Sequence, residues 1–294
     1  MTDRRTVAVL SPGEMGSQVG RALRSAGTTV VTCIGERSAA TRARAAAAGF
    51  ELTDTLDDLV RRAHLVISVV PSLSALPLAD SVAAAMARTG SRPTYLDANS
   101  IGPSTARKIE ASIAGVGAVF VDGSIIGGAS TLTKSATVYL SGEASTDVVG
   151  LLEPLRIEVI GTAAGQASGF KVLYAGLTKG LSALGVELLA GAARLGLQDR
   201  LLEKYQESQP SVARFFNQNL PGLPPRSARR AEEMIELSET LDELGLPSNM
   251  SKASQRTLET LAQRHREAAA PSTDDLETML AWLDGQHDGT NSHG

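Results

Sequence analysis

The sequence predicts an α/β Rossmann domain, with a mostly parallel and doubly wound sheet, followed by an all-α C-terminal domain. In the first half, short apolar runs rich in β-branched residues alternate with amphipathic stretches rich in alanine and arginine, which is typical of βαβ units. In the second half only helical periodicity is evident. We expect the first domain over residues 1–163, the helical domain over 164–284 and a disordered tail over 285–294.

The expected strands are short, and several lack polar alternation, which is typical of strands buried on both faces of a parallel sheet. They cover residues 6–10, 29–34, 64–70, 94–98, 118–121, 136–140 and 156–160. The second half begins with one long helical pattern rich in leucine and alanine, and further amphipathic stretches follow it. The expected helices there cover residues 170–197, 201–205, 211–217, 228–244 and 251–266.

Composition narrows the classes of function. The chain of 294 residues carries a formal net charge of -4 and 3% aromatic residues, so we expect no nucleic-acid surface. The single cysteine, Cys33, lies in an apolar run and is interpreted as a core residue, and the four histidines are scattered, so no metal site is expected. No apolar run approaches the roughly 18 residues of a membrane span. We expect a cytoplasmic protein.

A glycine-bearing turn follows the first expected strand and precedes a helical stretch. It reads Ser11-Pro12-Gly13-Glu14-Met15-Gly16. Gly13 would let the backbone approach a pyrophosphate at the helix N-terminus, and Gly16 would allow close helix–strand packing. Ser11 stands where such turns usually have their first glycine, which the turn tolerates if the φ angle of Ser11 is negative. The alternative is an ordinary βα turn without a ligand.

The end of the second strand indicates which dinucleotide is bound. NAD enzymes usually place an acidic residue there, to bond the ribose 2′-hydroxyl. Here Glu36 is followed by Arg37 and Ser38, with Arg42 a turn later, and a guanidinium with a hydroxyl at a helix start suits a 2′-phosphate. We predict NADPH or NADP⁺. Two alternatives stay open, because Glu36 could bond an NAD ribose and the arginines could be solvated helix positions.

Lys171 lies near the start of the long helical pattern. Thr178 and Ser182 fall almost in line with it at helical spacing, and Tyr174 lies on the same side, so a polar stripe interrupts an otherwise apolar helix. A lysine can change its protonation state when desolvated, which suits a proton-transfer group. The alternative is a lysine that snorkels at the helix edge.

The segment 122–128 follows the fifth expected strand and contains three glycines. Gly127 and Gly128 could present backbone N–H groups to an anionic oxygen of a substrate. From these residues alone, a plain loop that turns the chain after the sheet is an equal alternative.

Taken in order, these motifs resemble those of the β-hydroxyacid dehydrogenase and 6-phosphogluconate dehydrogenase superfamily, over residues 5–265. Within it, the chain is similar to bacterial oxidoreductases whose helical C-terminal domain was long of unknown function. The sequence departs from the family at Asn99 and Ile126, which each replace a serine, and at Tyr174 and Ala175, which replace an asparagine pair. The matching segments are residues 11–16, 69–72, 97–103 (family Asp-x-Ser-Thr-x-x-Pro), 122–128 (Asp-x-Pro-x-Ser-Gly-Gly) and 165–175 (Gly-x-x-x-Lys-x-x-Asn-Asn).

The resemblance implies a homodimer that transfers hydride between the nicotinamide and a carbonyl or alcohol carbon of a small polar substrate, as 3-hydroxyisobutyrate dehydrogenases do. Two alternatives stay open: an imine reductase, favoured by Tyr174, and a non-catalytic NADP(H)-binding sensor, favoured by the departures from the family. The implied catalytic residues are Lys171, as general acid or base, and Tyr174; the implied substrate residues are Asn99, Ser124, Gly127, Gly128 and Thr178; and residues 11–16, Val70, Pro71 and Asn99 would contact the cofactor.

Overall fold

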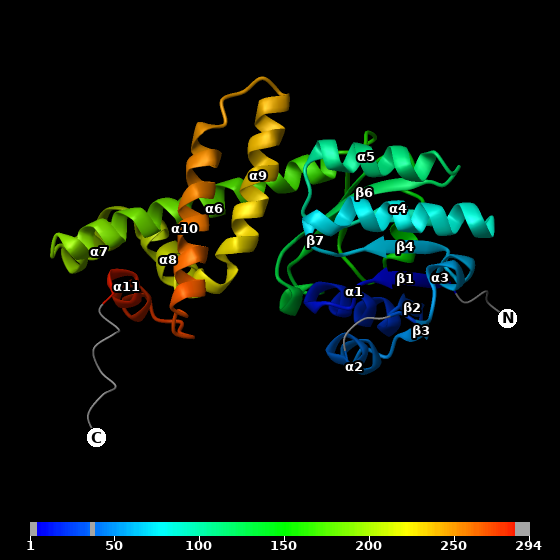
Figure 1. Ribbon diagram of the computed structural model, residues 1–294, viewed down its shortest axis with the longest axis horizontal. Coiled ribbons are helices and arrows are strands. Elements are labelled where there is room, and N and C mark those ends of the chain that lie inside the picture. Colours follow the sequence, from blue (N-terminus) through cyan, green and yellow to red (C-terminus); the bar gives the residue numbers. More distant parts are fainter. Residues whose placement is uncertain (1–4, 36–38, 286–294) are drawn as a thin grey trace. The chain divides into compact units, whose positions relative to one another are not determined.

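The computed structural model describes residues 5–35 and 39–285 of the chain (Figure 1). The described chain divides into two compact units, Met1–Val172 and Leu173–Gly294, and the division falls inside a long helix, α6 (Gln166–Arg194), rather than before it. Except for Gly285, the segment predicted as a disordered tail lies outside the described residues. The two units are described separately below.

The first unit holds an eight-stranded sheet of order β3-β2-β1-β4-β5-β6-β7-β8. All neighbouring strands are parallel except β6 and β7, which confirms the predicted mostly parallel sheet. The strands are β1 (Thr6–Leu10), β2 (Thr29–Cys33), β3 (Glu51–Thr53), β4 (Leu65–Ser68), β5 (Thr94–Asp97), β6 (Phe120–Ile126), β7 (Thr137–Ser141) and β8 (Ile157–Gly161).

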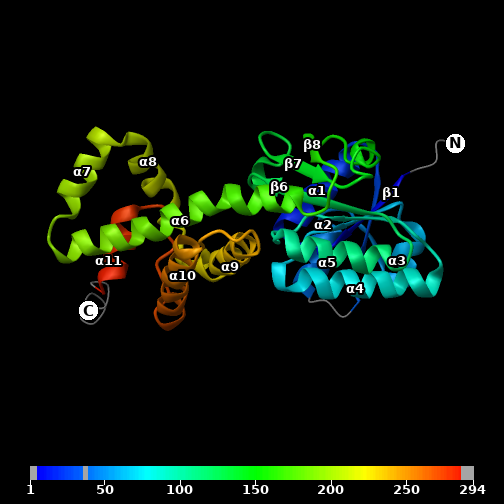
Figure 2. The ribbon, with the colours of Figure 1, turned by 90° about the horizontal axis from the view of Figure 1, so that it is seen from above.

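Helices cover both faces of this sheet (Figures 1 and 2). Successive residues of β1 point to opposite faces, so Val7 and Val9 enter the core beneath α1 and α2, whereas Ala8 and Leu10 enter the core beneath the other three helices. This double burial explains the unbroken apolar runs in the sequence. The helices are α1 (Glu14–Ser25), α2 (Ala39–Ala47), α3 (Leu56–Arg62), α4 (Ser72–Thr89) and α5 (Pro103–Ala114).

Strand order determines where this unit can bind a ligand. The chain moves from β1 outward to β3 and then crosses back to β4 on the opposite side of β1, so the direction of winding reverses between β1 and β4. In open parallel sheets, ligands bind beyond the carboxyl ends of the strands at such a reversal. The segments that follow β1, β4 and β5 therefore lie where such a sheet binds its ligand.

Two parts of the sheet differ from the sequence prediction. The three-residue edge strand β3 was not predicted, because Glu51 and Leu52 are exposed and the strand lacks an apolar run. The fifth expected strand ends at residue 121, but β6 continues to Ile126 and pairs antiparallel with β7. The polar residues Asp122 and Ser124 interrupt the apolar run of this strand, although both are buried and hydrogen-bonded inside the sheet.

The second unit is all-α in its described residues, as predicted. Its core combines Val186 and Leu189 of α6 with Phe216, Leu258 and Trp282 from later helices. The last helix was not predicted, although its N-terminus is capped by Asp275, whose side chain accepts a 2.7 Å hydrogen bond from the Thr278 N–H. The helices after α6 are α7 (Gln198–Ser208), α8 (Pro210–Asn219), α9 (Ser227–Glu243), α10 (Asn249–Glu267) and α11 (Leu276–Asp284).

By length and composition alone, α6 is the one helix in the described part of the chain that could cross a membrane. Central helices of globular domains pass the same test. Here Ala183, Val186 and Leu189 of α6 lie within the core of the second unit, which is the behaviour of a central helix.

Candidate active site

The turn between β1 and α1 is built on an unusual residue conformation. Ser11 has a φ angle of +70°, so the turn does not meet the condition, a negative φ, under which serine replaces the usual glycine without strain. Ser11 is the one residue other than glycine among those described that has a positive φ, a conformation that costs about 1–3 kcal/mol in such residues. Its carbonyl accepts a 2.8 Å hydrogen bond from the Gly13 N–H, and the Gly13 carbonyl then accepts from Ser17 to begin α1.

The two glycines of this turn have different reasons to be glycine. A Cβ atom on Gly16 would collide with the Ser11 carbonyl oxygen, so close packing of α1 on the turn requires a glycine there. Gly13 has a φ of −72°, and a Cβ atom placed on it would meet no heavy atom within 4 Å. The fold alone therefore does not require glycine at position 13. The open space beside it, at the N-terminus of α1, fits a pyrophosphate.

The rest of the predicted cofactor segment is partly described. Glu14 is exposed, Met15 packs against the sheet core, and Pro12 is buried. Arg42 is exposed on α2 and donates a hydrogen bond to the Gly35 carbonyl, so its guanidinium lies at the end of β2. Glu36, Arg37 and Ser38 lie outside the described residues.

A row of four polar residues crosses the sheet where β4 to β7 are paired. Ser68, Asp97, Asp122 and Ser141 are successive partners on these neighbouring strands, and all four are fully buried. None of the four residues was predicted to have a role. Their signal was present in the sequence, because a polar residue closes or interrupts each apolar run. We call this set the polar row.

One half of the polar row fixes Asn99. The Asn99 side chain is 2% exposed and makes three hydrogen bonds: from the Val70 N–H to Oδ1 at 2.5 Å, and from Nδ2 to Ser68 Oγ at 3.0 Å and Asp97 Oδ2 at 2.7 Å. These bonds join the segments after β4 and β5, beside half-buried Val70 and exposed Pro71. The contact of Asn99 with cofactor and substrate stays a prediction.

The other half of the polar row fixes the start of α6. The buried Asp122 carboxylate lies against the first turn of that helix, where orphan backbone N–H groups need acceptors. The Ser141 hydroxyl accepts a further bond from the Ala167 N–H at 2.9 Å. The bonds accepted by Asp122 come from Ser141 Oγ at 3.0 Å, Gly165 N at 2.9 Å, Ser168 N at 3.0 Å and Ser168 Oγ at 2.5 Å.

Both carboxyl groups of the polar row have raised pKa values. Burial is the largest cause for Asp97 and raises its pKa to about 7, against the hydrogen bonds that Asn99 donates to it, while the neighbouring Asp122 charge adds to the increase. Burial also raises the pKa of Asp122, against the donors of Ser168, Ser141 and Gly165. The positive charge of Lys171 acts on Asp97 in the opposite direction and lowers its pKa.

Lys171 lies where these segments meet. It is half-buried on α6, and its Nζ donates to the Asn99 carbonyl oxygen across 3.4 Å. The first unit thus brings Lys171 together with Asn99 and Val70 beyond the carboxyl ends of β4 and β5. Tyr174 and Thr178 belong to the second unit, where Tyr174 is 56% exposed and the exposed Thr178 hydroxyl donates to the Ala175 carbonyl.

The predicted substrate segment is divided by the structure. Ser124 is fully buried, and its hydroxyl donates to the Ala167 carbonyl at 2.9 Å and so helps to hold the start of α6. Its contact with a substrate stays a prediction. Gly127 and Gly128 are exposed after β6, and the φ of Gly127 is +136° with Ala136 against it. Within residues 5–35 and 39–285, no cluster of His, Cys, Asp and Glu could hold a metal ion.

Comparisons with known proteins agree with this arrangement. The family described as the NAD binding domain of 6-phosphogluconate dehydrogenase matches residues 6–155, and a domain of unknown function (DUF1932) matches residues 192–261. An uncharacterised 28.5 kDa protein of Methanothermus fervidus is 32% identical over 211 residues, which cover 71% of this chain and 80% of that protein.

Two solved structures are informative. The conserved protein MTH1747, of unknown function and described as similar to 3-hydroxyacid dehydrogenases, is 32% identical, with a TM-score of 0.69 over 88% of this chain and 97% of that one. A 3-hydroxyisobutyrate dehydrogenase of Mycobacterium tuberculosis, solved with L-serine, has a TM-score of 0.69 at 20% identity, over 95% and 99% of the two chains. At that identity the likeness concerns the fold alone.

The Gly13→Ala substitution tests whether the turn binds a dinucleotide. Because the added methyl group meets no protein atom, we expect an unchanged melting temperature. We also expect on the order of a tenfold loss of affinity for the dinucleotide, or about 1.4 kcal/mol, because the methyl group occupies the space of the pyrophosphate. Gly16→Ala is the matched comparison and should lower the melting temperature as well. Unchanged nucleotide affinity in Gly13→Ala would contradict the assignment.

The pKa of Asp97 predicts a pH dependence of stability. The folded protein binds this proton more tightly than the unfolded chain between the ordinary value of 3.8 and about 7. The resulting stabilisation is complete below 3.8 and is lost as the pH rises through about 7. In urea unfolding across this interval, the free energy of unfolding of the wild type should therefore fall relative to that of Asp97→Asn as the pH rises. A pH-independent difference would refute the shift.

Proposed function

The chain belongs to the family that carries the NAD-binding domain of 6-phosphogluconate dehydrogenase, and from this we propose that it is an NADP(H)-dependent oxidoreductase. The resemblance inferred from its motifs is confirmed. We propose that it transfers hydride between the nicotinamide and a carbonyl or alcohol carbon of a small polar substrate. The observation that carries this proposal is the position of Lys171 Nζ, 3.4 Å from the Asn99 carbonyl, at the carboxyl ends of the central strands.

The residues of the turn fit the cofactor. The N–H groups at the start of α1 would hold its pyrophosphate, with Gly13 permitting close approach, and Val70 and Pro71 would contact the nicotinamide end. A bound nicotinamide dinucleotide supplies or accepts the hydride, and the remaining chemistry belongs to this chain's own side chains. Preference for the phosphorylated form is supported by Arg42, which lies at the end of β2, and by the sequence of Arg37 and Ser38.

Lys171 is proposed to move the proton. A protonated Nζ donates to the carbonyl oxygen as the carbon is reduced, and a neutral Nζ accepts the proton of an alcohol in the reverse direction. The Asn99 carbonyl orients the amine, and Asp122 positions the helix that carries it. The exposed Gly127 and Gly128 are proposed to hold the substrate through their backbone, and Tyr174 and Thr178, one and two turns further along α6, to contact it or assist in proton transfer.

The Lys171→Ala substitution tests this role. We expect kcat to fall by roughly 10²- to 10⁴-fold, the usual contribution of a general acid or base, with little change in dinucleotide affinity. Lys108→Ala, which removes an exposed lysine of α5, is the matched control. Turnover close to that of the wild type in Lys171→Ala would exclude the lysine from proton transfer.

The substrate panel for this measurement separates the competing functions. It contains small hydroxy acids, aldehydes and cyclic imines, each assayed by NADPH oxidation or NADP⁺ reduction. Turnover of imines alone would identify the imine reductase that Tyr174 keeps open. Tight dinucleotide binding without turnover of any compound would identify a non-catalytic sensor.

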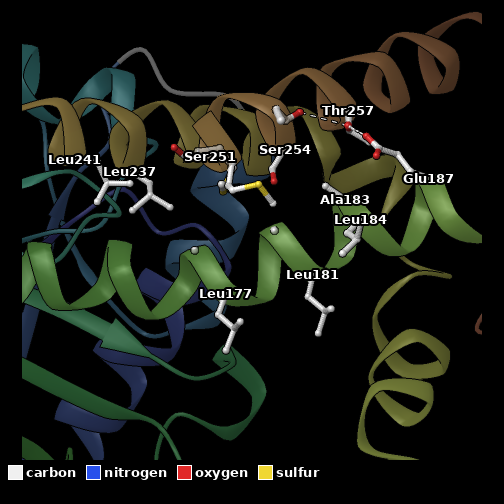
Figure 3. Close-up of a pocket in the computed structure, with 15 residues that line it drawn as sticks. Leu177, Leu181, Ala183, Leu184, Glu187, Leu237, Leu241, Ser251, Ser254 and Thr257 are labelled. Carbon is white, nitrogen blue, oxygen red and sulfur yellow. Dashed lines mark hydrogen bonds between the residues drawn. The ribbon is translucent and has the colours of Figure 1, made fainter. Parts of the chain in front are cut away.

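We further propose that the chain acts as a homodimer in the cytoplasm, where its lone thiol, Cys33, would remain reduced. Leu177, Leu184 and Leu188 of α6 are 75%, 42% and 40% exposed, which leaves an apolar helix face uncovered by the described residues. Leu177 and Leu184 also line a groove of about 380 Å³ between α6 and the pair α9 and α10. Figure 3 shows Leu237 and Leu241 on the opposite side of this groove, facing α6.

Light scattering measures the state of association. At micromolar concentration we expect twice the 30.6 kDa mass of the chain, and Leu177→Glu should reduce the measured mass, because it places a charge on the apolar face. Leu195→Glu is the control, since Leu195 is 74% exposed but follows the end of α6. A mass of 30.6 kDa for the wild type would contradict the dimer.

A further inference from the structure

The second unit contains a cluster of cationic side chains at the junction of α6 and α9. It comprises Lys179 of α6, Arg226 of the short 3-10 turn η3 (Pro224–Arg226), and Arg229 and Arg230 of α9. Glu233 is a carboxylate that pairs with two of the four, Lys179 and Arg229. Its oxygens lie 2.5 Å from Lys179 Nζ and 3.3 Å from Arg229 Nε. The cluster is therefore strongly positive.

The deeper members of the cluster are removed from water. The side chains of Lys179 and Glu233 are only 10% and 12% exposed. Burial is the largest cause that lowers the pKa of Lys179 and also that of Arg230, and nearby arginines lower both further. Removing a cation from water is costly unless an anion compensates it.

Of the two deeper cations, Arg230 is compensated more weakly than Lys179. Glu233 attracts it, but the hydrogen bond of its guanidinium goes to a neutral partner, Ser182 Oγ, at 3.3 Å. A guanidinium carries five donors, and buried ones normally meet a carboxylate or a phosphate in a bidentate contact. Most of the donor capacity of Arg230 is therefore available for a ligand.

The position of the arginines in the fold increases the positive potential. Arg226 precedes the first residue of α9, and Arg229 and Arg230 lie in its first turns, although the N-terminus of a helix already carries a partial positive charge. Acidic residues stabilise such a helix end, and α9 has none in its first turn. The local sequence thus disfavours its own helix start unless a negative charge joins it.

The cluster is open to solvent on one side. The Arg229 side chain is 76% exposed and Arg226 is exposed, whereas Lys179 and Arg230 lie deeper. Arg230 is itself partly exposed, so solvent and small ions have access to its side chain. We propose that this cluster is a binding site for a small oxyanion, preferentially a dianionic phosphate group, held by the Arg230 guanidinium and enclosed by Arg226, Arg229 and Lys179.

Binding of inorganic phosphate tests the proposal on the full-length protein. Thermal unfolding is followed with sodium phosphate and with sodium chloride at matched ionic strength, since a ligand that binds only the folded state raises the melting temperature. We expect phosphate to raise the melting temperature of the wild type more than chloride does, and not to raise that of Arg230→Gln. By calorimetry, Arg230→Gln should bind phosphate on the order of tenfold more weakly than the wild type. Arg214→Gln, an exposed arginine of α8, is the control and should resemble the wild type.

A second variant keeps the test valid if Arg230→Gln folds poorly. Glu233→Gln removes the carboxylate that competes with the anion for Lys179 and Arg229, so phosphate affinity should rise several-fold. A cluster that serves only internal ion pairing predicts no gain of affinity in Glu233→Gln. Three outcomes would overturn the proposal. They are an unchanged phosphate affinity in Glu233→Gln, equal stabilisation of Arg230→Gln and wild type by phosphate, and no stabilisation of the wild type by phosphate beyond that by chloride.

The phosphate group can be free or part of the substrate, and kinetics separates these sources. Only this kinetic comparison rests on the proposed function, and the phosphate-binding measurements are independent of it. Aldehydes with and without a phosphate ester are compared in wild type and Arg230→Gln. A KM that rises in the variant only for the phosphorylated member assigns the site to the substrate. Unchanged KM values, together with lost phosphate binding, assign it to a separate ion.

Discussion

The geometry of the candidate active site depends on the polar row that crosses the sheet at Ser68, Asp97, Asp122 and Ser141. Its most important contact is the Asp122 carboxylate, which accepts four hydrogen bonds and binds the first turn of α6 to the sheet. Lys171 follows within the next turn of that helix. The buried Asp122 carboxylate of β6 therefore determines the position of the Lys171 amine. Burial of that charge is unfavourable, and the four donors offset the cost.

The polar row also fixes the position of Asn99. Ser68 and Asp97 accept hydrogen bonds from the Asn99 side chain, and Asn99 in turn accepts from the Val70 N–H. The segments after β4 and β5 are thereby locked together. The Asn99 carbonyl then receives Lys171 Nζ. A rigid frame of this kind suits a reaction in which orientation of cofactor, substrate and proton donor supplies much of the rate.

Much of the fold could be predicted because local patterns and tertiary structure agree. The unbroken apolar runs of β1 and β4 follow from burial on both faces, and the glycine-bearing turn lies directly after β1. The edge strand β3 and the helix α11 were missed, since β3 lacks an apolar run and α11 depends on a cap by Asp275 and on packing of Trp282. Both departures reflect context that a local pattern does not contain.

The candidate site was predicted less completely, for a related reason. Lys171 was proposed from its place on an apolar helix and mainly from the resemblance to the dehydrogenase family, and Gly13 and Gly16 were proposed from their spacing after a strand. The buried hydrogen bonds of Asn99 and Ser124 could not be predicted, because the sequence does not tell whether a polar side chain completes a buried network. The positive φ of Ser11 was likewise hidden, since the surrounding turn imposes it on a residue that rarely adopts it.

The measurement that tests the central claim most directly is a titration of the purified protein with NADPH and with NADH, followed by nicotinamide fluorescence, for the wild type and for Arg37→Ala and Arg42→Ala. The account predicts tight binding of NADPH, weaker binding of NADH, and loss of about tenfold or more in NADPH affinity on removal of a guanidinium that holds the 2′-phosphate. Binding of neither nucleotide to the wild type would mean that the segment from Ser11 to Gly16 is only a turn, and the enzymatic account would fail with it.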